Sequence, residues 1–279
     1  MNLHHHFHPI VATPFRNDSG YWEVLPCEAL RPIVRCFWFS LSVPGPATLV
    51  VPDACMDILF TVDASTRRIS ARFCGMNDAP FYAPANMPGC FTFGVRFFAW
   101  SAALFAEESL RDTKNACCDA ERHFPSLVSA LSPRLARSRN FAECVAQAEA
   151  CLPRALSFCS PDDTLMNAVW SVLHSHGNLR AGQLARDSHI SPRQLERLFA
   201  QHIGVSPKGF ASLVRYQSLW REAVFSSHFD VLDAVERYGY VDQAHLLNSF
   251  KQFHSLSLRD ALAKARQNVG FLQAGAPLI

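Results

Sequence analysis

The chain has 279 residues, of which 49 % are apolar and 18 % charged, and its formal net charge is +2. This composition excludes a wholly disordered or collagen-like chain and suffices for about two folded domains. The longest apolar stretch, Phe91 to Ala106, contains Arg96 and is shorter than the roughly 20 residues that a membrane-spanning helix needs. The N-terminus lacks the pattern of a secretory signal. We therefore expect a soluble cytoplasmic protein with no membrane partner.

The first 108 residues have the pattern of a β-rich domain, because proline and glycine separate short apolar runs. In the last of these runs, Phe91, Phe93, Val95 and Phe97 alternate with small or polar residues, which predicts a strand with one apolar face. The expected strands are Arg35–Ser42, Thr48–Val51, Asp57–Val62, Ile69–Phe73 and Cys90–Phe98. Short strands of this kind are typical of a small barrel or sandwich.

From Ser101 onward the apolar spacing becomes helical, which predicts helices over Ala102–Leu110, Phe124–Leu135 and Phe141–Phe158. A turn at Ser160-Pro161-Asp162-Asp163 is the expected domain boundary. The fold class is therefore α+β with two domains. We expect a β-rich regulatory domain over 1–108, a helical connector or dimerisation region over 109–162, an all-α domain over 163–269 and a tail over 270–279.

The all-α domain begins with a helix-turn-helix pattern. A short helix containing Leu184 and Ala185 is followed by a turn and then by Ser191-Pro192-Arg193-Gln194. Ser191 is expected to cap the second helix, with Pro192 in the first turn and Gln194 completing a capping box. The apolar residues of this helix lie on one side, so its long polar side chains project from the other. This layout is typical of DNA-binding proteins.

A second copy of the layout follows. The segment from Val231 predicts a helix that ends at Tyr238, with Gly239 placed to take the left-handed cap conformation, and Asp242 is placed to cap the next helix. The segment from Pro207 to Phe225 predicts one long helix between the two motifs. If the recognition helices lie about one DNA turn apart, roughly 34 Å, they can enter successive major grooves.

Residues 163–268 resemble the C-terminal domain of AraC/XylS-type transcription regulators. The matching segments are Ser191–Phe199, Gly204-Val205-Ser206-Pro207 and Tyr238–Leu246, with Phe250-Lys251 after them. Two motifs in order, joined by a helix after G-x-S-P, are a specific signal. The sequence departs from the family where Ser255-Leu256-Ser257-Leu258 replaces a second G-x-S/T-P, which predicts a remodelled closing turn.

The resemblance implies a double helix-turn-helix domain that binds double-stranded DNA. The residues placed at base-facing positions are Arg193, Gln194, Glu196 and Arg197 in the first motif and Gln243, His245 and Asn248 in the second. Side chains of these types can donate to guanine or pair with adenine, and glutamate can accept from cytosine. Lys208 and Lys251 are expected to contact phosphates. The resemblance also implies RNA polymerase, a small-molecule effector and a second copy of the chain as partners, with no enzyme activity, catalytic residue, cofactor or metal site.

A weaker resemblance links Val51–Phe60 and Gly94-Val95-Arg96-Phe97 to the β-rich domain that precedes the DNA-binding part of many such regulators. It implies a regulatory module, in which Asp53, Asp57 and Arg96 are candidate effector contacts. An ion pair or turn cap is the competing explanation for three polar groups in apolar surroundings.

Two alternatives remain open from the residues. All ten cysteines precede residue 160, and none forms C-x-x-C spacing. They favour reduced, mostly inert thiols, but a thiol-responsive regulator is an alternative. The tract His4-His5-His6-Phe7-His8 could bind a transition metal, or bind one only adventitiously on a flexible end. A metal-binding β-barrel enzyme fused to a DNA-binding module is the third possibility, although residues 9–108 contain no histidine.

Overall fold

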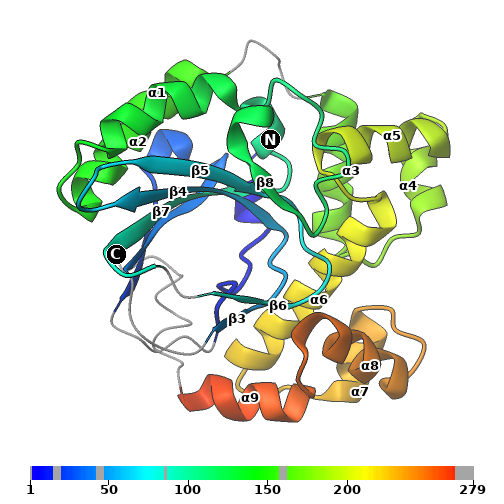
Figure 1. Ribbon diagram of the computed structural model, residues 1–279. Coiled ribbons are helices and arrows are strands. Elements are labelled where there is room, and N and C mark those ends of the chain that lie inside the picture. Colours follow the sequence, from blue (N-terminus) through cyan, green and yellow to red (C-terminus); the bar gives the residue numbers. More distant parts are fainter. Residues whose placement is uncertain (1, 15–19, 42–46, 85–86, 157–161, 268–279) are drawn as a thin grey trace.

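The computed structural model describes residues 2–14, 20–41, 47–84, 87–156 and 162–267 (Figure 1). Within these ranges a β-rich N-terminal region is followed by a C-terminal region built of helices. The predicted α+β class is confirmed. The predicted boundary at Ser160-Pro161 and the tail over 270–279 lie outside the described residues.

The strands form one larger and one smaller antiparallel sheet. The described strands are β1 (Tyr21–Val24), β2 (Val34–Leu41), β3 (Thr48–Val50), β4 (Cys55–Asp63), β5 (Ile69–Cys74), β6 (Phe81–Ala83), β7 (Cys90–Phe98) and β8 (Cys117–Asp119). The larger sheet has the order β1-β2-β7-β4-β5-β8, and β3 pairs with β6. The larger sheet has two edges, so in the described part of the chain it is open rather than a closed barrel.

One face of the larger sheet packs on two helices, α1 (Pro125–Leu135) and α2 (Phe141–Ala155) (Figure 1). Phe93, Val95 and Phe97 of β7 are fully buried, as the alternating pattern predicted. The opposite face of this central strand is covered as well, because the Trp38 indole lies over Gly94, where an added Cβ would come within 2.1 Å of the ring.

The helix expected over Ala102–Leu110 is not formed. Only Ala102–Leu104 makes a short 3-10 helix, like Leu3–His5, Glu28–Leu30 and Ala120–Arg122 elsewhere. The amides beyond it bond to distant carbonyls: Glu107 N–H donates to His123 O, and Leu110 N–H donates to Gln201 O. These tertiary hydrogen bonds replace the local ones that a helix would have used.

The C-terminal helices are α3 (Asp163–His174), α4 (Ala181–Asp187), α5 (Pro192–His202), α6 (Pro207–Phe225), α7 (Val231–Arg237), α8 (Gln243–His254) and α9 (Leu258–Gln267). Helices α3, α4 and α5 gather at one end of α6, and α7, α8 and α9 gather at the other (Figure 1). The long helix therefore joins two helical groups.

The N-terminal region packs against the middle of α6. Gln217, which is 1 % exposed, accepts from Ile10 N–H at 3.0 Å and donates to Pro52 O at 2.6 Å. Arg221 donates to His8 O at 3.1 Å. The histidine tract is thus part of a docked segment, contrary to the flexible end expected, because Leu3 and Phe7 beside the histidines are buried.

Candidate nucleic-acid interface

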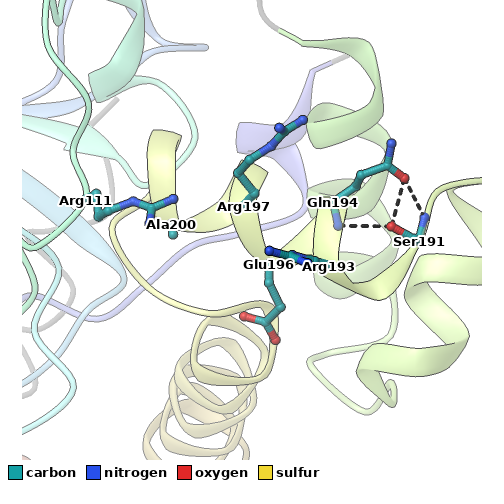
Figure 2. A pocket seen from close by; sticks show the side chains of 7 residues that line it. All are labelled: Arg111, Ser191, Arg193, Gln194, Glu196, Arg197 and Ala200. Carbon is teal, nitrogen blue, oxygen red and sulfur yellow. Dashed lines mark hydrogen bonds between the residues drawn. The ribbon is translucent and has the colours of Figure 1, made fainter.

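The first recognition helix is α5, and its start is built as predicted. Ser191 Oγ accepts from Gln194 N–H at 3.2 Å, and Gln194 Oε1 accepts from Ser191 N–H at 2.9 Å, which completes the capping box. Leu195 and Phe199 are buried on the inner side of the helix. Arg193, Glu196 and Arg197 are exposed, so this row of side chains is open to a ligand (Figure 2).

Gln194 has two predicted roles that compete for the same atom. Its Oε1 accepts from both Ser191 N–H and Ser191 Oγ, so the side chain is held back against the start of the helix (Figure 2). A bidentate contact with adenine needs both the oxygen and the NH2 group. Gln194 would have to leave the cap to make it.

The second recognition helix is α8. Asp242 caps it by accepting from His245 N–H at 2.7 Å, and Leu246 and Phe250 are buried beneath it. The predicted base-facing residues Gln243, His245 and Asn248 are all exposed. Nδ1 of His245 accepts from Val241 N–H at 3.3 Å, which occupies one of its two ring nitrogens.

The turns of the two motifs have the same hydrogen bonds. Ile190 N–H donates to Ala185 O in the first motif, and Tyr240 N–H donates to Val235 O in the second. This six-to-one bond is a Schellman turn, whose preceding residue has positive φ. That residue is His189 (φ 54°) in the first motif and Gly239 (φ 65°) in the second.

Helix α6 sets the separation of the two motifs. Its 19 residues span about 28 Å. The recognition helices pack beside opposite ends of α6, and one turn of DNA is about 34 Å long. The dimensions are therefore compatible with binding in successive major grooves.

A residue of the N-terminal region joins the first motif. Arg111 lies with Arg193 and Arg197 around an open hollow of about 580 Å³, whose other lining residues are Ser191, Gln194, Glu196 and Ala200 (Figure 2). The segment carrying Arg111 is fixed to the end of α5 by the Leu110–Gln201 hydrogen bond of 2.9 Å. Next to it, a Cβ on Gly204 would lie 2.8 Å from Thr113 Oγ1, which shows how close the two segments are.

Sequence patterns did not identify Arg111, since its relation to α5 depends on contacts between distant parts of the chain. The two lysines predicted to contact phosphates, Lys208 in the first turn of α6 and Lys251 in α8, are both exposed.

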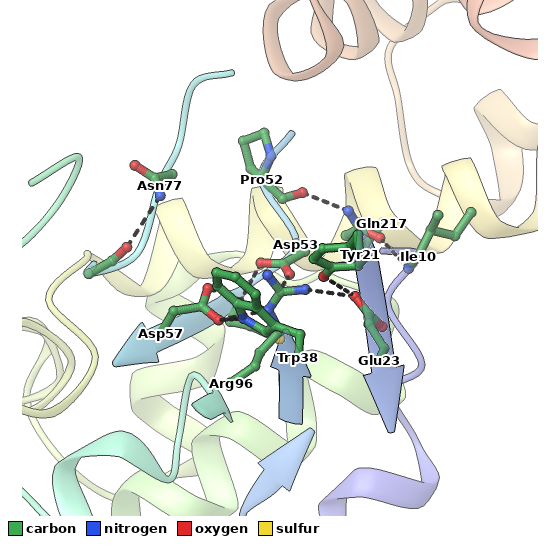
Figure 3. Close-up of polar contacts among 12 residues, drawn as sticks. Ile10, Tyr21, Glu23, Trp38, Pro52, Asp53, Asp57, Asn77, Arg96 and Gln217 are labelled. Atoms are coloured by element: carbon green, nitrogen blue, oxygen red, sulfur yellow. Dashed lines mark hydrogen bonds and ion pairs between the residues drawn. The ribbon is translucent and has the colours of Figure 1, made fainter. Parts of the chain in front are cut away.

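The candidate effector residues form a buried cluster on the β-sheet (Figure 3). Arg96 is 6 % exposed, and its Nε lies 3.0 Å from Asp57 Oδ1 and 3.6 Å from Asp53 Oδ2. Glu23, which sequence patterns did not single out, lies 3.5 Å from Arg96 Nη1 and accepts from Tyr21 Oη at 2.5 Å. These side chains thus pair with one another. Asp53 Oδ1 also accepts from Cys55 N–H at 3.0 Å and so caps the backbone at the start of β4.

Three carboxylates surround a single guanidinium in this cluster. Burial raises the pKa of Asp53 to about 6, although Arg96 acts in the opposite direction. Asp53 follows directly after Pro52, whose carbonyl accepts from Gln217 of α6. The cluster therefore lies beside the contact between the sheet and the helix that joins the two motifs (Figure 3).

A metal centre would need several ligating side chains close together among the described residues. No group of three or more histidine, cysteine, aspartate or glutamate side chains among them is arranged to hold a metal ion. None of the described helices is both long enough and apolar enough to cross a bilayer.

Comparison with known proteins agrees with this geometry. Residues 184–264 match the family described as "Helix-turn-helix domain", and residues 22–119 match a domain of unknown function, DUF6597. The segment that matches the helix-turn-helix family runs from α4 into α9. Its two motifs are the α4–α5 and α7–α8 pairs.

One curated relative, an uncharacterized HTH-type transcriptional regulator from Haemophilus influenzae, is 33 % identical over 110 residues. The match covers 38 % of this chain and spans about a third (36 %) of the length of that relative.

Two solved structures are also similar. ToxT from Vibrio cholerae has a TM-score of 0.41 at 11 % identity, over 82 % of this chain and 98 % of that one. A transcriptional regulator from Chromobacterium violaceum, described as an AraC-type DNA-binding domain-containing protein, has a TM-score of 0.34 at 22 % identity, over 38 % of this chain and 94 % of that one.

Proposed function

We propose that this protein is a sequence-specific DNA-binding regulator of transcription whose α5 and α8 bind successive major grooves. The observation that carries the proposal is the pair of exposed polar rows held at the two ends of α6. Arg193, Glu196 and Arg197 contact base edges in one groove, and Gln243, His245 and Asn248 contact base edges in the next.

Lys208, Lys251 and Arg111 contact phosphates. Arg111 belongs with them because it lines the hollow beside α5 together with Arg193 and Arg197, and a surface with several guanidiniums favours an anionic partner. Such contacts position the protein without reading sequence.

The test is a mobility-shift selection from random DNA, followed by measurement of Kd at about 100 mM salt. The double variant Arg193→Ala/Arg197→Ala should lose preference for the selected site by about 10-fold or more, since a good bidentate pair contributes about 1–3 kcal/mol of discrimination. Arg137→Ala, an exposed arginine just after α1, is the matched control and should bind as the parent does. Unchanged preference in the double variant contradicts the proposed residue roles.

The phosphate contacts are tested by salt dependence. Arg111→Ala, Lys208→Ala and Lys251→Ala should each weaken binding to all sequences alike. Each should also reduce the slope of log K against log salt by about 1. A variant Arg111→Ala that binds more tightly would instead show that the N-terminal segment hinders DNA.

The N-terminal region is proposed to control this activity through an effector or a partner subunit, with RNA polymerase as a further partner. Asp53, Asp57 and Arg96 are the proposed link to α6, since Pro52 next to them bonds Gln217. Asp57→Asn, which removes the negative charge 3.0 Å from Arg96 Nε, should change the response to the regulatory signal while the site selected from random DNA stays the same. A changed site preference would contradict this division of roles.

A further inference from the structure

Two cysteines face each other across the edge of the larger sheet. Cys74 of β5 lies directly opposite Cys117 of β8, and their Sγ atoms are 2.7 Å apart. In the same register Gly75 N–H donates to Ala116 O, so Gly75 and Ala116 are a hydrogen-bonded pair. Pairs alternate along an antiparallel ladder, and Cys74 and Cys117 are therefore a non-hydrogen-bonded pair with Cα atoms about 4.5 Å apart.

This backbone spacing lies within the range of about 4.4–6.8 Å that disulfides require. A bond between the two sulfurs needs no rearrangement of the strands. Cys118, the neighbour of Cys117, is directed differently, because its Sγ approaches Phe73 O at 3.7 Å. The pairing is thus specific to Cys74 and Cys117 rather than to the adjacent Cys117-Cys118.

The surroundings of Cys117 favour its thiolate. The hydrogen bond from Cys74 and the nearby Arg72 guanidinium, whose Nε lies 3.4 Å from Cys117 Sγ, lower the pKa of Cys117 to about 6. Cys117 is also exposed. By contrast, burial raises the pKa of the Cys36, Cys55 and Cys144 thiols. A thiolate on the surface with a second thiol in contact is the arrangement of a reactive cysteine and its resolving partner.

We propose that Cys74 and Cys117 are a redox pair that forms a reversible disulfide when a hydroperoxide reacts with Cys117. The Cys117 thiolate attacks the terminal peroxide oxygen, the O–O bond breaks, and the leaving alkoxide or hydroxide takes a proton. Cys117 becomes a sulfenic acid. The Cys74 sulfur then attacks the Cys117 sulfur, and water leaves with the proton of Cys74. In total, two thiols and one hydroperoxide give one disulfide, one water and one alcohol (or a second water), and a dithiol reductant reverses the change by exchange.

The site lies at one end of the segment that carries Arg111. Residues 107–116 lead directly into β8, and Asn115 N–H donates to Met76 O just after β5. A Cys74–Cys117 disulfide therefore links β5 to β8 at the edge of the sheet, next to the segment that contacts α5. At this location a disulfide can make the regulator thiol-responsive, and this part of the inference rests on the proposed function. Disulfide formation itself does not depend on DNA binding.

The experiment is peptide mapping of the full-length protein. The reduced protein is treated with one equivalent of hydrogen peroxide, free thiols are alkylated, and the protein is digested with trypsin. Cys74 falls in the peptide 73–96 together with Cys90, and Cys117 falls in the peptide 115–122 together with Cys118. These two peptides should appear linked, two hydrogens lighter than their sum.

Matched variants assign the link. Cys90→Ser/Cys118→Ser should keep the linked peptide, and Cys74→Ser and Cys117→Ser should each abolish it. In Cys74→Ser, Cys117 should remain as a sulfenic acid that dimedone labels, a readout that misfolding would not produce. A link that disappears in Cys90→Ser/Cys118→Ser, or a disulfide-bonded dimer in place of the internal link, overturns the proposal.

The role of Arg72 is tested by the pH dependence of alkylation. The rate at Cys117 should rise with a midpoint near pH 6 in the parent. In Arg72→Gln the midpoint should move toward the ordinary cysteine value of about 8.5, which slows alkylation at pH 6 by several-fold. Cys27, the other exposed cysteine among the described residues, serves as the internal reference. Equal pH profiles for Cys117 and Cys27 contradict the proposed activation.

Discussion

The two helix-turn-helix motifs have the same plan but are fixed to the molecule differently. The first is held from outside, by the Leu110–Gln201 hydrogen bond and by the contact of Thr113 with Gly204. The second is held from within, by a ring cluster in which Tyr216, Trp220 and Phe250 surround His254. The N-terminal region therefore contacts the first motif directly, whereas its contacts with α6 join it to the second.

Removing the contact at the middle of α6 should have the largest effect. Gln217→Leu leaves Ile10 N–H and Pro52 O without the partner that each has in the parent. We expect the free energy of unfolding to fall by about 2–4 kcal/mol, because each buried polar group left unpaired costs about 1–3 kcal/mol. Denaturant titration measures it. Gln252→Leu, an exposed glutamine on α8, is the control and should stay within about 0.5 kcal/mol. Equal losses in both variants would show that the contact is energetically unimportant.

The anchor of the first motif is broken by Gly204→Ala. The new Cβ would lie 2.8 Å from Thr113 Oγ1 and 2.9 Å from Leu110 O, at a φ of +79° that L-residues disfavour. We expect a loss of about 2–3 kcal/mol, measured by thermal or denaturant unfolding. Hydrogen exchange at Leu110 N–H should also become faster, since its acceptor Gln201 O moves away.

Gly209→Ala is the matched control, because its Cβ would meet the Ser206 hydroxyl at 3.3 Å and no backbone atom of the N-terminal region. Faster exchange at Leu110 in this control as well would mean that the whole first motif has loosened rather than its anchor.

Structure that is decided by neighbouring residues could be predicted from the sequence. The caps at Ser191 and Asp242 were predicted because capping is decided by residues three positions apart. Strands β2, β3, β4, β5 and β7 were predicted from apolar runs that proline and glycine separate. Strands β1, β6 and β8 were missed because three or four residues give no detectable alternation. Strand β3 is equally short, but prolines on both sides mark its run.

The interface to α6 could not be predicted at all. Gln217 looks like an ordinary polar helix residue, since its partners lie 207 and 165 positions away. For the same reason Ala102–Leu110 was wrongly predicted as a helix, and Arg111 was not recognised as part of the interface. The predicted base-facing residues are exposed as required, but their contacts with DNA stay predictions.

The core of the second motif should make stability depend on pH. Burial, with a smaller contribution from Lys264, lowers the pKa of His254 to about 3, and its Nδ1 lies 2.6 Å from Tyr216 Oη. In the unfolded chain the imidazole takes up a proton near the ordinary histidine pKa of 6.5, so the unfolded state binds more protons than the folded state between these values. The contribution of His254 to the free energy of unfolding therefore falls by about 2 kcal/mol from pH 7 to pH 5.

The measurement compares the parent with His254→Phe at both pH values. A comparison is needed because Asp53, whose pKa is raised to about 6, has the opposite sign: its contribution is lost as the pH rises through that value. The difference in stability between parent and variant should change by about 2 kcal/mol. His228→Phe, at an exposed histidine, should keep the pH dependence of the parent, and the same dependence in His254→Phe would contradict the prediction.

The turns that follow α5 and α8 allow the most direct comparison of the two motifs. The change in stability expected there is the smallest. After α5 the positive φ falls on Gly204, and after α8 it falls on Ser255 (φ 63°). The two turns differ, as predicted, because Ser255 follows the last residue of α8 directly, whereas Ile203 separates Gly204 from the end of α5. Ser257 caps α9 by accepting from Asp260 N–H at 3.1 Å. Serine pays a steric penalty in this conformation that glycine avoids.

We therefore expect Ser255→Gly to raise the free energy of unfolding by about 0.5–1 kcal/mol, the reverse of the sign for Gly204→Ala. The control is Ser226→Gly, which follows α6 with a φ of −73° and should not stabilise, because glycine there only adds entropy to the unfolded chain. If Ser255→Gly destabilises the protein, the serine side chain stabilises the turn by more than the strained backbone of Ser255 destabilises it. The second motif would then close by a different balance of forces from the first.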